Sequence, residues 1–438
     1  MEALILLNDG VTEVPVISLT TFADAREAYR HKALRQALYD EGNRLMDGVV
    51  VNLHGSAHLD RRRLENRLFR RDTFQWYEAE RIPAIIAEVL EPAISLGRGD
   101  LLPLARRTML TLSLLVAGVD RQSSMGADQP TDQQGDAEAR NGELDAIYAL
   151  MDRLARASTV AHAVGDKAAI IADGDAALEE FQVLFFEPSR RRRLEILESF
   201  AAGRIAEEEL PKDVLTTLLR NQDRLVLPFE TVLRETAYFP WVGSHSTSNQ
   251  LVHAMHHIFE WISEHPRDRH QLTTNSILLQ RFIHESMRLH PASPVSMRVA
   301  LENVTLKSGV EISIGDEVAI RLDAVNRDPS IWGADADLFN PLRLVPDGAM
   351  PWGLSFGHGL HACLGQELAA GVELPRYTNS SLDDYSLDAT EPGHLVGSVT
   401  VMAQAMLSAG AQVDPDNPPH QDQSTTRQVW GTYPVRFG

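Results

Sequence analysis

The most distinctive chemical feature of the sequence is a single cysteine inside a glycine-rich segment, FGHGLHACLG, residues 356–365. Cys363 is the only cysteine among 438 residues, so it cannot form an intramolecular disulfide. The glycines around it allow backbone conformations and close approaches that side chains forbid. The segment CLGQELAAGVEL, from Cys363 onward, is typical of a helix, which puts the sulfur at a helix N-terminus. The helix dipole there is expected to hold the thiol pKa below its usual value of about 8.5.

Local features leave more than one role open for this cysteine. A thiolate nucleophile needs a basic partner, and His361 is two residues away. A thiolate metal ligand instead needs N–H donors around the sulfur. An isolated cysteine is also commonly a small buried hydrophobic side chain. A wider sequence pattern decides among these interpretations.

The cysteine segment resembles the haem-ligand signature of the cytochrome P450 superfamily. The matching positions are Phe356, Gly357, Gly359, His361, Cys363 and Gly365. Upstream, ESMR at 285–288 is similar to the family's E-x-x-R motif, and FNPLR at 339–343 is similar to its F-x-P-x-R segment. A Glu–Arg pair three residues apart is weak support by itself, because such pairs are usually solvated helix contacts. In this order and at these distances, the two motifs corroborate the resemblance.

The resemblance implies a haem-thiolate site in which Cys363 is the proximal ligand of the iron of haem b, iron protoporphyrin IX. The two haem propionates need cations or strong hydrogen-bond donors around them. The implied haem-binding residues are His58, Arg62, Arg298, Phe356, His361 and Gly365. Glu285, Arg288 and Arg343 are expected to form a buried triad that fixes the ligand loop.

The predicted long helix 228–264 is expected to cross the distal face of the haem. In the family, its centre carries an acid and an alcohol that deliver protons for oxygen activation. Here VGSHST, residues 242–247, has His245 in place of the acid and Ser246 in place of the alcohol. Histidine donates and accepts protons near neutrality, so His245, Ser246 and Thr247 are the candidate catalytic residues. Alternatively, His245 points at the protein while Thr247 and water act, or the enzyme does not need the usual relay.

The hydrophobic pattern predicts a mainly α protein with small β-sheets, and the resemblance implies the cytochrome P450 fold. No internal repeat is visible, so we expect one domain over 1–438 with loops at 120–142 and 413–426. Apolar residues at helical spacing predict helices at 24–40, 56–70, 144–163, 190–202, 228–264 and 277–289, and strand-like alternation occurs at 298–320 and 429–437.

Two departures from the family pattern are expected to change the fold locally. Only 57 residues precede the H-x-x-x-R pattern that begins at His58, several tens fewer than family members have. We therefore expect a shortened N-terminus in which the first helix and the opening strands are missing or reduced. Residues 371–393 interrupt the helix after the cysteine, so we expect an insertion that packs in place of those elements.

The substrate pocket can be placed only by analogy with the family. It is expected to take residues from 43–52, from the centre of helix 228–264, from 291–297 and from the stretch near 160–188, with polar recognition from Asn52 and Ser296. The candidate pocket residues are Val49, Val50, Trp241, Val242, Val295 and Met297.

Charge excludes some partners and suggests another. The formal charge of −20 argues against nucleic-acid binding, which needs clustered cations. The start of the sequence has no basic leader and only a short apolar run, so we expect neither a signal peptide nor a membrane span, and a cytoplasmic location. The basic segment RRRLENRLFRR, 61–71, either docks an acidic ferredoxin-type electron donor or is a solvated helix face. The segment HAMHH, 253–257, has the spacing of a metal-binding histidine pair, but no Glu or Cys completes a site, so a solvated or packed helix surface is favoured.

The combined interpretation is a haem-thiolate monooxygenase of the soluble bacterial type. It would oxidise a small organic substrate with O₂ and take electrons from a separate ferredoxin and reductase, since no flavin or iron–sulfur domain is evident. One alternative is a peroxide-driven peroxygenase or an atypical coupling or rearrangement enzyme. Another is a non-catalytic haem-binding sensor, suggested by the replacement of the usual acid and alcohol at His245 and Ser246.

Overall fold

Helices form most of the structure, a computed structural model that describes residues 16–121, 133–374 and 393–438. The prediction of a mainly α protein with small β-sheets is confirmed. In chain order the α-helices are α1 (Phe22–Arg30), α2 (Asn43–Met46), α3 (Gly55–Glu65), α4 (Arg71–Trp76), α5 (Ile82–Ser95), α6 (Leu101–Ala117), α7 (Gln133–Ser158), α8 (Lys167–Phe181), α9 (Glu187–Ala201), α10 (Val214–Arg220), α11 (Gln222–Leu225), α12 (Phe229–Glu264), α13 (Arg269–Thr274), α14 (Ser276–Leu289), α15 (Leu322–Val325), α16 (Pro329–Trp332), α17 (Gln366–Ala370) and α18 (Ser398–Ser408). The strands are β1 (Val16–Leu19), β2 (Leu34–Gln36), β3 (Arg98–Asp100), β4 (Val295–Ala300), β5 (Val304–Thr305), β6 (Glu311–Ile312), β7 (Glu317–Arg321), β8 (Gln412–Val413), β9 (His420–Gln421), β10 (Trp430–Thr432) and β11 (Pro434–Arg436).

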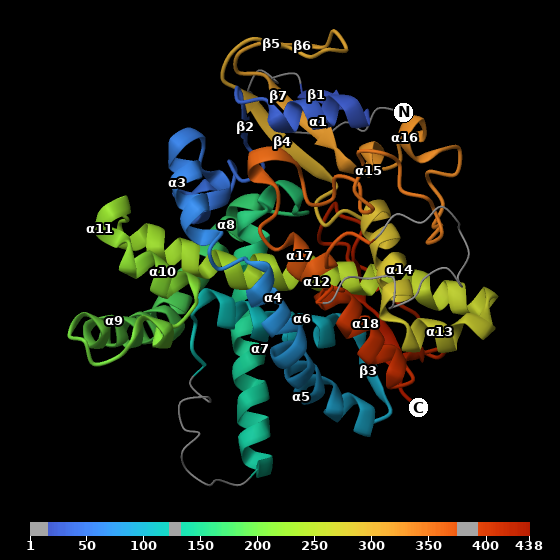
Figure 1. Ribbon diagram of the computed structural model, residues 1–438, viewed down its shortest axis with the longest axis horizontal. Helices are drawn as coiled ribbons and strands as arrows, with labels where there is room; N and C mark the ends of the chain where they lie inside the picture. The colour runs from blue at the N-terminus through green and yellow to red at the C-terminus, as the bar shows by residue number, and fades with distance from the viewer. Residues whose placement is uncertain (1–15, 122–132, 375–392) are drawn as a thin grey trace.

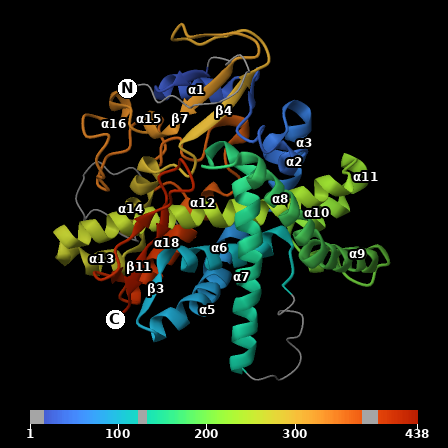
Figure 2. The same ribbon diagram turned by 180° about the vertical axis from the view of Figure 1, so that it is seen from behind.

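The 36-residue helix α12 runs through the middle of the molecule, as Figure 1 and Figure 2 show. Helix α6 packs closely against it where α12 carries Gly243, because a Cβ there would lie 2.5 Å from the Ser113 hydroxyl oxygen. Near this point the hydroxyls of Ser244 and Ser246 donate to the carbonyls four residues earlier, at 2.7 and 2.6 Å. Such back-bonding adjusts the local course of a helix, so the centre of α12 is shaped by both its glycine and its alcohols.

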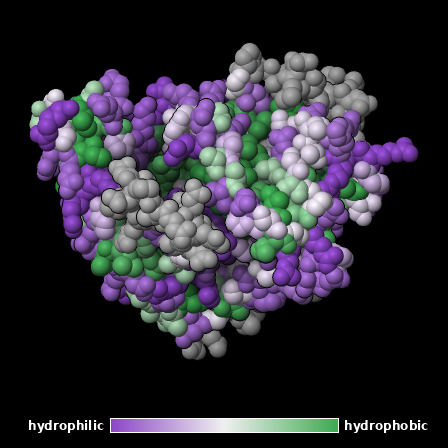
Figure 3. Space-filling model, turned by 90° about the horizontal axis from the view of Figure 1, so that it is seen from below, coloured by the Kyte–Doolittle hydropathy of each residue, from purple (hydrophilic) through white to green (hydrophobic). Residues whose placement is uncertain are grey.

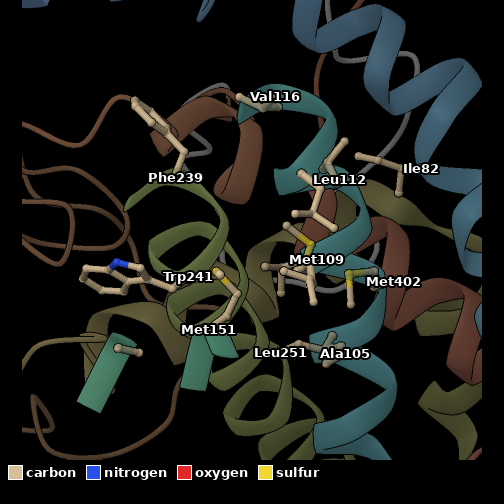
Figure 4. Close-up of a cluster of buried hydrophobic side chains, with 14 of the residues drawn as sticks. Ile82, Ala105, Met109, Leu112, Val116, Met151, Phe239, Trp241, Leu251 and Met402 are labelled. Carbon is tan, nitrogen blue, oxygen red and sulfur yellow. The ribbon is translucent and has the colours of Figure 1, made fainter. Parts of the chain in front are cut away.

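The main hydrophobic core surrounds α12. Figure 4 shows side chains from α5, α6, α7, α12 and α18 converging in one cluster, among them Met109, Leu112, Met151 and Met402. Fully burying an aliphatic side chain contributes about 1.5–3 kcal/mol relative to leaving it exposed. This packing fixes α6 and α7 against α12, and those three helices carry much of the site described below.

A four-stranded sheet lies at one end of the molecule, with the strand order β1-β7-β4-β2. The pair β1–β7 is parallel, whereas β4 runs antiparallel to both of its neighbours. Arg298 pairs with Gln36 across β4 and β2, so the register places this predicted haem-binding arginine inside the sheet. A second core cluster, which includes Leu19, Phe22 and Val318, packs α1 against this sheet.

The N-terminal elements differ from expectation. The predicted helix 24–40 is wrong beyond Arg30, because residues 34–36 form β2 and pair with β4. The described part of the chain places β1, α1 and β2 before the His58 helix α3, and both strands belong to the four-stranded sheet. The opening part of the sheet is therefore not missing from this protein.

The predicted loops and the predicted insertion have mixed outcomes. Helix α7 begins at Gln133, so the predicted loop 120–142 is wrong from that residue onward. Within the predicted loop 413–426, His420 and Gln421 form the short strand β9. Residues 375–392 of the predicted insertion lie outside the described residues, so its packing stays a prediction. Helix α18 follows it and lies against α14 and α17.

One face of the molecule is mostly hydrophilic, with hydrophobic residues gathered in smaller areas between charged ones (Figure 3). None of the helices in the described ranges is long and apolar enough to span a lipid bilayer.

The histidines of the HAMHH segment meet a further histidine at the end of α14. His257 Nε2 lies 2.9 Å from His290 Nε2, and the His253 ring stacks on His290 with ring centres 4.3 Å apart. Burial lowers the pKa of His253 to about 4 and that of His257 to about 3, and it lowers the His290 pKa as well. Within the described residues, no group of three or more His, Cys, Asp or Glu side chains is arranged to hold a metal ion. These histidines pack between α12 and α14 as neutral rings.

The basic segment 61–71 is only partly a surface feature. Arg61 is buried, and its guanidinium lies 2.5 Å from the carboxylate of buried Glu235 on α12. The backbone N–H of Val50 also donates to Glu235, at 3.0 Å. Glu65 is fully buried too, and neither of its carboxyl oxygens has a hydrogen-bond partner among the described residues. The expectation that the whole segment is a docking or solvated face is wrong for Arg61, because its charge pairs with Glu235 in the protein interior.

Burial raises the pKa of Glu65, and repulsion from the Glu235 carboxylate raises it further. A carboxyl with a raised pKa binds its proton more tightly in the folded state than in the unfolded chain. The contribution of Glu65 therefore lowers the free energy of unfolding once the pH rises above its unfolded-state pKa, near 4.5. This loss grows until the pH reaches the folded-state pKa.

We predict opposite effects for two substitutions in this network. Arg61→Met leaves Glu235 buried without its cation and should lower the free energy of unfolding by about 3–5 kcal/mol. Glu65→Gln should leave stability unchanged near pH 4.5 and raise it relative to the native protein as the pH increases. Urea unfolding at pH 5 and pH 7.5 measures both effects, with exposed Glu88→Gln on α5 as the matched control. Equal destabilisation by the two substitutions at both pH values would show that Glu65 is an ionised partner of the network.

Candidate active site

A cavity of about 610 Å³ lies among the residues predicted to do chemistry. Its walls come from α3, α6, α7, α12 and β4, from the loop before α17, and from residues 422–431 near the C-terminus. Cys363 borders the cavity, and so do His245, Ser246 and Thr247 on α12. The fold thus brings the cysteine segment and the centre of α12, far apart in the sequence, onto one cavity.

Two glycines give the cysteine loop its shape. Gly357 and Gly359 have φ angles of 70° and 71°, a conformation that other residues rarely adopt. A Cβ on Gly359 would lie 2.8 Å from the backbone oxygen of Tyr29, so the loop also presses tightly against α1. The Cys363 N–H donates to the Phe356 carbonyl at 2.9 Å and closes the loop. The close backbone approach that glycine allows is therefore made, at Gly359, to α1 of the same protein.

The surroundings of the sulfur differ from expectation. Helix α17 begins at Gln366 and ends at Ala370, before Gly371 with its φ of 76°, so the segment after Cys363 is helical for only five residues. Burial raises the pKa of the Cys363 thiol, while the Gly365 N–H and the charge of Arg62 act to lower it. The expected depressed pKa is therefore wrong for the protein chain by itself, because burial outweighs the donors near the sulfur.

Four of the predicted haem-binding residues gather beside the cysteine loop. The rings of His58 and His361 stack with centres 3.9 Å apart, and burial lowers their pKa values to about 4 and about 3. The Arg62 guanidinium donates to the Ala362 carbonyl. Arg298 is buried, donates to the Gln36 side chain and lies over the Tyr29 ring. All four border the cavity, as do Phe356 and Gly365.

The predicted triad forms a buried ion-pair network behind the loop. Arg288 makes two hydrogen bonds of 2.8 Å to the Glu285 carboxylate, and the Arg343 Nε donates to the same group at 3.2 Å. Arg288 Nη1 also donates to the Asn326 carbonyl at 2.6 Å, and the Asn326 amide donates back to the Arg288 carbonyl at 3.0 Å. Asn326 Oδ1 then accepts the Leu354 N–H at 2.8 Å. Through Asn326, which was not among the residues expected at the site, the triad is connected to the chain that leads into the cysteine loop.

These observations fit the haem that the resemblance implies. The sulfur and Gly365 border the same cavity, and nothing lies within 4 Å of where a Gly365 Cβ would stand. His58 Nε2 is buried without a hydrogen-bond partner among the described residues, as expected for a donor that faces a propionate. Cys363 would hold the iron, while His58, Arg62, Arg298 and His361 would surround the carboxylates.

The centre of α12 contains a pairing that no sequence motif indicates. His245 Nδ1 lies 3.0 Å from the Trp241 carbonyl, and His245 Nε2 lies 3.3 Å from Asp152 Oδ1 on α7. The Tyr148 ring stacks parallel to the imidazole, and Arg106 on α6 reaches within 4.0 Å of Asp152. Burial lowers the pKa of His245, and its contact with Asp152 opposes that shift. Burial acts to raise the pKa of Asp152, but His245, Arg106 and Arg156 together lower it.

Most of the predicted pocket residues border the cavity, and two do not. Those that do are Val50, Trp241, Val242 and Val295. Val49 is fully buried in the main core instead, just before the short turn that carries Val50. Met297 packs against that core from the sheet. Neighbouring side chains along an element face different sides, so a sequence range assigned to the pocket does not specify which of its side chains border the cavity.

Comparisons with known proteins agree with this geometry. Residues 249–391 match the family model described as Cytochrome P450. The "Biotin biosynthesis cytochrome P450" of Bacillus subtilis (strain 168) is 30% identical over 158 residues, which are 36% of this chain and 37% of that relative. The matched region thus spans just over a third of the relative's length.

Two solved structures share the fold over nearly the whole chain. CalO2 superposes with a TM-score of 0.69 at 18% identity, covering 97% of this chain and 91% of that chain. P450BioI, solved in complex with hexadec-9Z-enoic acid ligated acyl carrier protein, gives a TM-score of 0.68 at 16% identity, covering 96% and 92%. Identities this low establish the fold alone, and the expected cytochrome P450 fold is confirmed. Residues 249–391 therefore resemble the cytochrome P450 family, and the described chain has the fold of solved cytochromes P450, a family whose members bind haem b.

Proposed function

We propose that this protein is a cytoplasmic haem-thiolate monooxygenase that oxidises a small organic substrate with O₂ and electrons from a separate ferredoxin-type partner. The observation that carries the proposal is that Cys363 and the α12 residues His245, Ser246 and Thr247 border one cavity. Cationic and histidine side chains stand beside the cysteine, where two carboxylates of a haem would need them.

The cofactor would be held from one end of the cavity. Cys363 would be the iron ligand, His58, Arg62, Arg298 and His361 would receive the propionates, and the backbone at Gly365 would lie close to the porphyrin. When bound, haem b with a thiolate ligand supplies the activation of O₂. The Glu285–Arg288–Arg343 network would hold the ligand loop in place through Asn326.

His245 and Asp152 would store and transfer a proton at the cavity. With its hydrogen on Nε2, a neutral His245 donates to the ionised Asp152 carboxylate. Protonation of Nδ1 adds a donor that faces the Trp241 carbonyl, so the ring can take up a second proton there and release it. The Asp152 side chain is 36% exposed, which lets water reach it and replace the proton. Asp152 thus supplies, through His245, the acid that the α12 sequence itself lacks.

The electron donor would approach the exposed part of the basic segment. Arg63, Arg67 and Arg70 are exposed on the segment whose Arg62 donates to the Ala362 carbonyl of the cysteine loop. Arg71 joins this surface to α17 through an ion pair with Glu367, with N and O atoms 3.1 Å apart. An acidic ferredoxin-type protein is complementary to such a surface, and complementary charge accelerates encounter.

Turnover of the haem-loaded protein tests the proposed function. With a surrogate ferredoxin and reductase, we expect NADPH consumption to rise when a substrate that perturbs the haem absorption spectrum is added, with a hydroxylated or otherwise oxidised product. Product formation with peroxide only would support the peroxygenase alternative instead. A ligand-induced change of the haem spectrum without product under either condition would indicate a haem-binding sensor. Both this result and product formation with peroxide only would refute the monooxygenase.

The proton-transfer role predicts a specific loss. Asp152→Asn and His245→Ala should each keep haem and substrate binding while product formed per NADPH falls, on the order of a hundredfold for full loss of general acid catalysis. The solvent isotope effect on product formation should rise, which a purely structural role would not cause. Asp145→Asn on the same helix, where Asp145 pairs with Arg107 on the surface, is the matched control. Unchanged coupling in both variants would exclude the pair from proton delivery.

A further inference from the structure

Arg427 is a cavity-lining cation for which the described residues provide no counter-ion. It lies in the loop between β9 and β10 and borders the cavity. Its Nε is enclosed and has no hydrogen-bond partner, and no carboxylate acts on its guanidinium within the described part of the chain. Burial lowers the Arg427 pKa, and the charged group that opposes this shift is the phenol of Tyr39 rather than a carboxylate. An arginine nevertheless stays protonated in a protein, so this partly buried charge has an energetic cost until an anion meets it.

The other charges in this part of the cavity are balanced among themselves. Asp152 faces Arg106 and is lowered in pKa by both Arg106 and Arg156. The charge of Asp422 also acts on Arg106, and its carboxylate accepts hydrogen bonds from Ser424. Arg106 and Arg156 thus have Asp152 and Asp422 as counter-ions, whereas Arg427, in the same part of the cavity, has no carboxylate partner among the described residues.

The backbone around Arg427 is held rigidly. The Thr426 N–H donates to the His162 carbonyl at 2.8 Å, and the Val164 N–H donates to the Ser424 carbonyl at 2.9 Å. These bonds join the Arg427 loop to the connection between α7 and α8. Because the loop backbone is already held, only the Arg427 side chain has to be ordered when it binds a ligand.

The haem propionates would have a separate set of partners. Arg62, His58, Arg298 and His361 come from α3, β4 and the cysteine loop, and two of them form contacts with one another beside Cys363. Arg427 reaches the cavity from the C-terminal loop. The remaining lining is largely apolar, with Phe69, Met109, Leu112, Val116 and Phe239 among its side chains.

We infer that Arg427 receives the carboxylate of the substrate, which would be an organic acid with an apolar body. This inference rests on the proposed function and names its substrate class. A guanidinium presents a planar fork of donors that matches a carboxylate. The apolar walls would cover the rest of the molecule and direct it toward the α12 residues.

Binding of matched acids and neutral analogues to the haem-loaded protein tests the inference. The probes are dodecanoate with dodecan-1-ol and methyl dodecanoate, and cinnamate with cinnamyl alcohol, titrated by the haem absorption change that reports displacement of the iron-bound water. In at least one set, we expect the acid to bind at least about tenfold more tightly than its neutral partners. Arg427→Gln should weaken acid binding by about tenfold to a hundredfold and leave the neutral analogues unchanged, because a hydrogen bond to a charged group contributes about 1.5–3 kcal/mol. Exposed Arg224→Gln on α11 is the matched control.

Three results would overturn the inference. The first is that neutral analogues bind as tightly as the acids, or that no acid binds. The second is that Arg427→Gln weakens acids and neutral analogues equally. The third is that the variant binds haem more weakly than the Arg224→Gln control while its haem-loaded fraction keeps the preference for acids, which would assign Arg427 to a propionate. Any of these in a protein whose reduced carbon monoxide complex shows intact thiolate ligation leaves the proposed function standing, whereas absence of that spectrum refutes the proposed function itself.

Discussion

The position of the Cys363 sulfur at the edge of the cavity is the constraint on which the rest of the structure depends. It is set by backbone contacts more than by the cysteine itself: the Cys363 N–H bonds the Phe356 carbonyl, and Gly359 lies against the Tyr29 backbone. Behind the loop, the Ser355 hydroxyl donates to the Met287 carbonyl at 2.6 Å, and Asn326 connects Leu354 to Arg288. The Arg288 side chain is fully buried, so its charge is stable there only because the Glu285 carboxylate and several backbone carbonyls accept its hydrogen bonds. Helix α14, the turn at Asn326 and the cysteine loop therefore form one rigid unit.

A second theme is the use of charge inside a largely apolar protein. Buried charges are costly unless paired, and the described residues pair nearly every one at this site. Glu235 has Arg61, Asp152 has Arg106 and His245, and Glu285 has its two arginines. The exceptions are informative. Glu65 avoids the cost through a raised pKa. Arg298 and Arg427 cannot release their protons and have no carboxylate partner among the described residues, and we propose that a haem propionate and a substrate carboxylate meet them.

Much of the site could be predicted because its motifs are local in sequence. The positions of His361, Cys363 and Gly365 are fixed relative to one another by a few covalent bonds, and the long helix α12 follows from apolar spacing over 36 residues. The pairing of His245 with Asp152 could not be predicted in this way, because it depends on how α7 crosses α12. The same holds for β2, whose residues read as helix but pair with β4 far along the chain. Val49 and Met297 were misplaced because a zone of sequence does not specify which side chain faces a cavity. Arg427 carries no motif, and only the lack of a nearby carboxylate among the described residues distinguishes it.

The most direct test of the central claim is the absorption spectrum of the purified, haem-loaded and reduced protein after addition of carbon monoxide. We predict the band diagnostic of intact thiolate ligation in the native protein and its loss in Cys363→Ser. Leu360→Ala, at an exposed position of the same loop, should retain the band. A native protein without that band, or a Cys363→Ser variant that keeps it, would contradict the account.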